Sequence, residues 1–133
     1  MMKYLSGWEA LNIPNKIKQI ADWHPYRLLK EPNKLRFFNL KKDYPLGKLG
    51  LEKRYVATLK KEYIVASFAR AIADLVYYDE TKGLKNCVKD FLDENEEKEL
   101  FTYLKIINKS KNVENFMIYE LTKLYFEDKE NYA

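Results

Sequence analysis

The chain has 133 residues, enough for one domain of ordinary size with a sizeable hydrophobic core. Hydrophobic residues make up 47% of it and aromatic residues 15%, a composition that excludes disordered, collagen-like and low-complexity proteins. The net charge of +4 is unevenly distributed: residues 1–89 contain 18 Lys and Arg against 9 Asp and Glu, a difference of +9, and residues 90–133 contain 6 against 11, a difference of −5. A basic region of that size is typical of proteins that bind nucleic acid or an acidic partner, and also of merely lysine-rich soluble proteins.

Cysteine usage and hydropathy indicate the compartment. Cys87 is the only cysteine, so no disulfide can form within the chain, which favours a reducing cytoplasm. The stretch 1–9 lacks the apolar core of a signal peptide, and no apolar run approaches the ~18 residues that a membrane-spanning helix needs. We therefore expect a cytoplasmic protein with no membrane contact.

The first residues predict two short helices. The spacing of apolar residues predicts a helical turn or two over 5–11, with Ser6 as its N-cap and Glu9 completing a reciprocal capping box. A second short helix is predicted over 16–21.

Extended pieces with turns between them follow up to residue 66. The pieces 26–30 and 34–40 flank a Pro-Asn turn and have the form of a hairpin. In the second piece apolar and basic residues alternate, so we expect Phe37 to face inward and Arg36 outward.

A second hairpin is predicted after a loop over 41–50 that contains Pro45 and two glycines. The β-branched and aromatic residues of 55–59 and 63–66 form its strands, with a turn over 60–62. The first half is therefore expected to be a small antiparallel or mixed sheet.

From Ser67 the hydrophobic period changes from 2 toward 3.6, which predicts helices. Ser67 can cap the first helix, which should end near Gly83. Apolar residues at helical spacing predict three more helices: a short one over 84–92, one over 100–107 capped by Asp93 or Asn95, and one over 113–124 capped by Asn112.

These elements define the expected fold class. It is α+β, a single domain over 1–133 in which residues 1–66 are mainly strands after short helices and residues 67–133 form an array of about four helices.

Most catalytic constellations lack the residues they require. His24 is the only histidine and lies in a Trp-His-Pro-Tyr turn, which excludes His-rich zinc sites and favours a structural role for it. None of the four glycines belongs to a phosphate-binding loop. We predict no catalytic residue, no metal and no cofactor.

A metal-dependent nuclease is nevertheless a second alternative, because it needs only carboxylates that converge on Mg²⁺ and a nearby lysine. Its candidate residues are Glu62, Asp74 and either Lys60 or Lys61. Nothing in their spacing is specific for that chemistry.

Basic and aromatic residues are interleaved in 34–38 and 41–44. On a sheet face such residues can contact phosphates and stack on bases, although any half-buried strand shows the same alternation. A small basic nucleic-acid-binding protein is therefore the first alternative. The candidate contacts with nucleic acid or with a partner are Arg36, Lys41, Lys42, Lys60 and Lys61.

The segment 63–78 reads Tyr-Ile-Val-Ala-Ser-Phe-Ala-Arg-Ala-Ile-Ala-Asp-Leu-Val-Tyr-Tyr and has a more specific pattern. Ser67 can cap a helix, and Arg70 and Asp74 lie four residues apart on one helix face, where they can pair. The segment resembles the strand-to-helix hallmark of AbiEi-type antitoxins, the antitoxin half of type IV abortive-infection toxin–antitoxin pairs, which typically reads V-A-S-P-E-R-A-L-A-D-L-L-Y. Phe68-Ala69 stands where that hallmark has Pro-Glu.

The opening segment, 4–11, is also similar to the Ser-Gly-x-x-Ala-Leu start of the carboxyl-terminal domain of that family, so the resemblance covers most of the chain. It implies a non-catalytic antitoxin that opposes a nucleotidyltransferase-like toxin. Full antitoxins of this type carry an amino-terminal winged helix that binds the operator, and the chain begins where that module would end. Either the start is truncated or the chain is a stand-alone antitoxin domain, so the resemblance implies the antitoxin function and leaves operator binding open.

Overall fold

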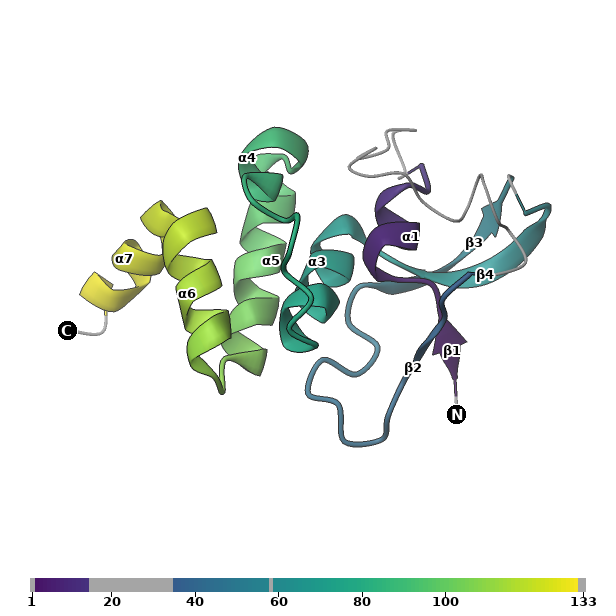
Figure 1. The fold of residues 1–133 in the computed structure, drawn as a ribbon, viewed down its shortest axis with the longest axis horizontal. Coiled ribbons are helices and arrows are strands. Elements are labelled where there is room, and N and C mark those ends of the chain that lie inside the picture. Colours follow the sequence, from purple (N-terminus) through teal and green to yellow (C-terminus); the bar gives the residue numbers. More distant parts are fainter. Residues whose placement is uncertain (1, 15–34, 58, 132–133) are drawn as a thin grey trace.

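The computed structural model describes residues 2–14, 35–57 and 59–131. The molecule is elongated, with the strands at one end and the last two helices at the other (Figure 1). Two two-stranded antiparallel sheets precede five helices in the described second half, so the predicted α+β class is confirmed, with one more helix there than expected. The predicted helix over 16–21, the strand over 26–30 and His24 lie outside the described residues.

The first sheet joins the start of the chain to residues that we expected in a local hairpin. Strand β1 (Lys3–Tyr4) pairs antiparallel with β2 (Phe38–Asn39), with Tyr4 opposite Phe38. Phe38 is 4% exposed and Phe37 is 37% exposed, so the predicted inward orientation of Phe37 is wrong. The reason is the pairing: Phe38 shares the face of Tyr4, whose ring centroid lies 5.8 Å from its own, and Phe37 points to the opposite face.

The second hairpin is confirmed, but its first strand and its turn lie nearer the start of the chain than the predicted strand over 55–59 and turn over 60–62. Strand β3 (Leu51–Val56) pairs antiparallel with β4 (Lys61–Ala66) from Leu51 opposite Ala66 to Val56 opposite Lys61. Most residues of β3 are exposed or half-buried, so its sequence lacks the alternation of apolar and polar residues by which a strand is recognised. Leu5 forms a parallel bridge to Val65, which connects the start of the chain to the inner edge of the hairpin.

Helix α3 (Phe68–Tyr77) lies at the centre of the molecule, between the strands and α5 (Figure 1). It ends at Tyr77 rather than near Gly83. Asp79 adopts a left-handed conformation (φ 61°), and the backbone N–H groups of Asp79 and Glu80 donate to Val76 and Leu75, as in a Schellman motif. An aspartate, which tolerates the left-handed region, thus ends the helix before the glycine.

The short helix α1 (Gly7–Leu11) packs against α3, and its predicted capping box does not form. Ser6 is the N-cap by position, but its side chain makes no capping hydrogen bond. The Ser6 hydroxyl donates instead to Asp74 of α3, whose charged carboxylate is a stronger acceptor than a neutral group.

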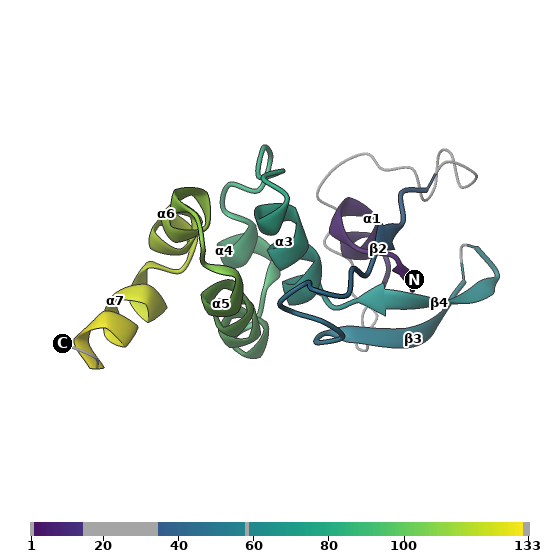
Figure 2. The ribbon, with the colours of Figure 1, turned by 90° about the horizontal axis from the view of Figure 1, so that it is seen from below.

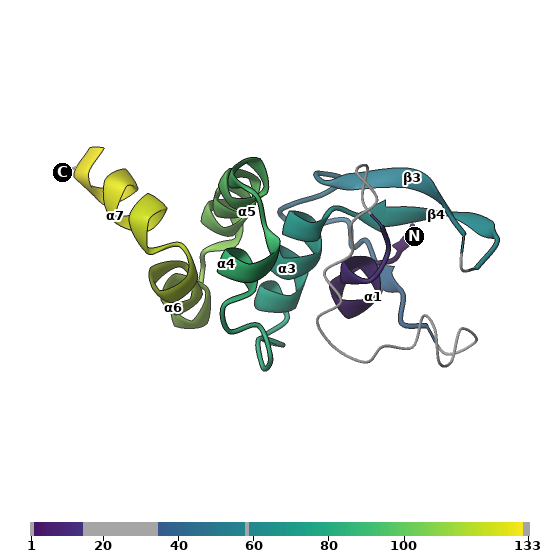
Figure 3. The ribbon, with the colours of Figure 1, turned by 90° about the horizontal axis from the view of Figure 1, so that it is seen from above.

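The remaining helices are α4 (Cys87–Phe91), α5 (Glu94–Ile107), α6 (Lys111–Glu120) and α7 (Thr122–Asn131). Along the long axis α4 and α5 follow α3 at about the same distance, and α6 and α7 lie farther out (Figures 2 and 3). The predicted cap of α5 is confirmed, because Asp93 and Glu96 form a capping box. Cys87 is buried at the start of α4. Within the described ranges, no helix has the length and hydropathy needed to cross a membrane.

The predicted helix over 113–124 is two helices, and its predicted cap is wrong. Ser110, not Asn112, caps α6 by accepting a hydrogen bond from the backbone N–H of Val113. The chain leaves helical geometry at Leu121 (φ −126°, ψ 40°), which is buried. The apolar spacing continues across this break, so the sequence pattern does not reveal it.

Candidate functional site

The segment 63–78 places three polar residues on or beside the central helix. Ser67 caps α3 as predicted, because its Oγ accepts a hydrogen bond from the backbone N–H of Arg70 at 3.1 Å. Every residue from Phe68 to Val76 is buried, including Arg70 and Asp74. The predicted pairing of Arg70 with Asp74 is confirmed, with 3.0 Å between Nε and Oδ1.

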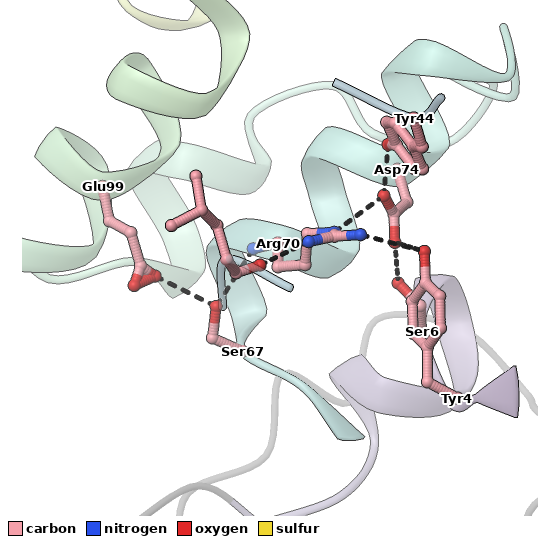
Figure 4. Close-up of polar contacts among 8 residues, drawn as sticks. Tyr4, Ser6, Tyr44, Ser67, Arg70, Asp74 and Glu99 are labelled. Carbon is pink, nitrogen blue, oxygen red and sulfur yellow. Dashed lines mark hydrogen bonds and ion pairs between the residues drawn. The ribbon is translucent and has the colours of Figure 1, made fainter. Parts of the chain in front are cut away.

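Asp74 is the centre of a buried hydrogen-bond network drawn from three parts of the chain (Figure 4). Its Oδ2 accepts from the hydroxyls of Tyr4 at 2.9 Å and Ser6 at 2.7 Å. Its Oδ1 accepts from Arg70 and from the hydroxyl of Tyr44. The two oxygens of a carboxylate offer about four lone-pair sites, and four donors occupy them here.

Arg70 connects this network to the loop before β3. Its Nη1 donates to the backbone carbonyl of Leu49, and its Nη2 donates to the Tyr4 hydroxyl at 3.2 Å. The guanidinium also lies between two rings, 5.3 Å from the centroid of Tyr4 and 5.1 Å from that of Tyr44. The positive charge is therefore compensated by Asp74 and stabilised by two aromatic faces.

Burial and the neighbouring charges set the protonation states. Burial, and after it the charge of Asp74, raise the pKa of Tyr4 and of Tyr44, so both phenols stay neutral and act as donors. Burial alone would lower the pKa of Arg70, but Asp74 raises it above the ordinary value. A saturated ion pair of this kind holds segments together and has no free group for acid–base chemistry.

A cavity of about 490 Å³ opens beside Ser67, between the base of the hairpin and the start of α5. Val65 and Phe68 provide apolar surface, and Glu96 and Glu99 are among its polar lining residues. These carboxylates are already engaged, because Glu96 completes the capping box of α5 and Glu99 accepts from the Ser67 hydroxyl at 3.0 Å. The cavity thus lies beside the start of α3, and the carboxylates of Glu96 and Glu99 that line it already have hydrogen-bond partners.

The residues predicted to contact nucleic acid or a partner are not brought together. Arg36 lies on the side of Phe38, with its guanidinium 4.4 Å from that ring, and pairs bidentately with Glu80 at 2.6 and 2.7 Å. Lys41 and Lys42 are exposed in the loop before β3. Lys60 and Lys61 are exposed where the hairpin turns, at the other end of β3 from that loop (Figure 1).

The nuclease candidates are also apart. Asp74 is buried and fully occupied by donors, whereas Glu62 is an exposed strand residue whose carboxylate lies 3.8 Å from the ammonium of Lys53. Among residues 2–14, 35–57 and 59–131, no group of three or more His, Cys, Asp or Glu side chains is arranged to hold a metal.

Three members of the Asp74 network were not predicted as such. Tyr4 and Tyr44 have no local signal, because they contact residues 70 and 30 positions away. Ser6 was interpreted as a helix cap. An unusual buried charge pair in α3 could have indicated that polar partners are needed, but not which residues supply them.

Comparison of the chain with protein-family models, with curated proteins and with solved structures found no match.

Proposed function

We propose that the chain is a non-catalytic, cytoplasmic antitoxin-like domain, similar to the carboxyl-terminal domain of AbiEi-type antitoxins, that opposes a nucleotidyltransferase-like toxin. One observation supports the proposal above the others. The two segments that carry the resemblance, 4–11 and 63–78, meet at Asp74, which accepts from Tyr4 and Ser6 of the first segment and from Arg70 of the second. The motif residues therefore belong to one structural unit.

The buried state of that unit favours a binding role over catalysis. Arg70 and Asp74 have no exposed surface, so neither can reach a substrate without unfolding the centre of the molecule. Their contribution is to fix β1, α1 and the loop before β3 against α3. The surface that meets the toxin must therefore lie elsewhere, on exposed residues that this framework positions.

The basic first half is the surface we assign to the toxin. Lys41 and Lys42 are exposed on the loop that Arg70 and Tyr44 hold in place. A nucleotidyltransferase-like toxin carries carboxylates at its metal site, and a cationic loop is complementary to such a site.

The test is co-expression of this chain with a nucleotidyltransferase-like toxin of a type IV toxin–antitoxin pair. Wild type should restore growth, and the charge reversal Lys41→Glu/Lys42→Glu should reduce the rescue. The matched control is Lys109→Glu/Lys111→Glu, which changes two exposed lysines in the acidic second half. Loss of rescue in both variants would contradict the assigned surface, and no rescue by a folded wild type would contradict the function itself.

A further inference from the structure

One face of the strand region carries exposed aromatic and basic residues that come from separate parts of the chain. Leu5 and Val65 are neighbours in the parallel bridge, so they share a face. Strand alternation places Lys3 on the face of Leu5, and Tyr63 and Lys61 on the face of Val65. Phe37 points to this face too, because its neighbour Phe38 faces the core opposite Tyr4. We call Lys3, Phe37, Lys61 and Tyr63 the platform.

Three members of the platform, Phe37, Tyr63 and Lys61, are in contact with one another. The ring centroids of Phe37 and Tyr63 lie 5.7 Å apart, and the ammonium of Lys61 lies 5.8 Å from the centroid of Tyr63. Lys3 and Lys61 are exposed, as is Phe37, and Tyr63 is half-buried. A strand pattern that normally buries a phenylalanine has instead left its ring at the surface, beside a second ring.

We propose that the platform binds single-stranded nucleic acid, with an unpaired base stacked on Phe37 and Tyr63 and the adjoining phosphates paired with Lys3 and Lys61. The face is covered at Leu5 and Val65, which are buried, and is accessible at Phe37, Lys3 and Lys61. An accessible aromatic ring beside lysines suits such ligands, because every base has a face that stacks and every phosphate is anionic. Bases in a duplex are already stacked on each other, so a duplex cannot use the rings. The binding does not depend on a toxin, and it is a second activity of the chain.

The experiment is a fluorescence-polarisation titration of the purified full chain with a labelled oligo-dT and a labelled oligo-U, each at low and moderate salt. Either oligonucleotide should bind more tightly than a duplex of equal length. Phe37→Ala should weaken the binding roughly 5-fold to 150-fold, the range for loss of one stacking ring. Lys3→Gln/Lys61→Gln should lower the slope of log affinity against log salt by about 1.4, at about 0.7 per phosphate contact.

Matched variants distinguish binding at the platform from nonspecific binding to exposed lysines or aromatic residues elsewhere on the surface. Tyr119→Ala removes an aromatic side chain that is 80% exposed on α6, and Lys123→Gln removes an exposed lysine on α7. Both should leave the affinity unchanged, and thermal melts should show that Phe37→Ala stays folded, because the ring is partly exposed. The proposal is overturned if neither oligonucleotide binds at low salt, if the duplex binds as tightly as the single strands, or if Phe37→Ala and Tyr119→Ala have equal effects.

Discussion

The ion pair between Arg70 and Asp74 should couple far more strongly than a surface pair of the same spacing. Replacing Asp74 by Asn leaves a guanidinium buried at 0% side-chain exposure without its counter-charge. Removing one partner of a buried pair costs about 3–5 kcal/mol, because the remaining charge is no longer compensated. Asp74→Asn also replaces the anionic acceptor of three hydroxyl donors, so we expect a loss in the upper part of that range.

A double-mutant cycle measures the coupling. In urea unfolding followed by circular dichroism, Arg70→Met and Asp74→Asn should each lower the free energy of unfolding by several kcal/mol. The double variant should lose about 2–3 kcal/mol less than the sum of the single losses, because neither charge is then left alone.

The chain supplies its own control for this cycle. Glu94 and Lys98 are also four residues apart, at 3.4 Å, but their side chains are 83% and 62% exposed. Exposed pairs of this spacing couple by about 0.3–0.5 kcal/mol. Equal coupling energies in the two cycles would refute the conclusion that burial strengthens the coupling between Arg70 and Asp74.

Three further predictions concern the backbone, a helix cap and the response to pH. Gly50→Ala should lower the free energy of unfolding by more than the strain of a left-handed alanine, about 1–2 kcal/mol, because φ is +75° and the new Cβ would lie 2.7 Å from Cβ of Arg70. The control Gly47→Ala should cost only that strain, because φ is +51° and nothing lies within 4 Å of the new Cβ. Equal shifts of the melting temperature in the two variants would contradict this. Ser110→Ala should cost about 1 kcal/mol in urea unfolding and Asn112→Ala less than half of that, and the reverse order would contradict the cap assignment. Burial, and then Glu99, raise the pKa of Tyr103 to about 12 from the ordinary 10.0, so the stability from its neutral phenol is complete below pH 10.0 and is lost as the pH rises toward 12. The absorbance of tyrosinate should therefore show Tyr103, identified by the signal missing in Tyr103→Phe, ionising near pH 12. Ionisation of that residue near pH 10.0 in the folded chain would contradict the assignment.

Local patterns were sufficient for the helix at the centre of the candidate site. The cap by Ser67, the pairing of Arg70 with Asp74 and the cap by Asp93, one of two residues predicted for it, all follow from residues three or four positions apart. Interactions at that spacing are set by helix geometry alone, so the sequence predicts them without knowledge of the fold.

What the sequence did not predict depends on distant partners. Strands β1 and β2 have two residues each, which is too short for any period to be recognised, and their pairing decides that Phe38 is buried and Phe37 is not. The same pairing brings Tyr4 to Asp74. Ser6 had a local role available as a cap, and its tertiary bond to a buried carboxylate replaced that role.

Growth of cells that express the nucleotidyltransferase-like toxin, with and without this chain, tests the proposed function most directly. The proposal predicts that wild type restores growth and that a variant with a broken core pair, Asp74→Asn, does so only to the extent that it remains folded. A folded wild-type chain that leaves the toxin fully active would contradict it.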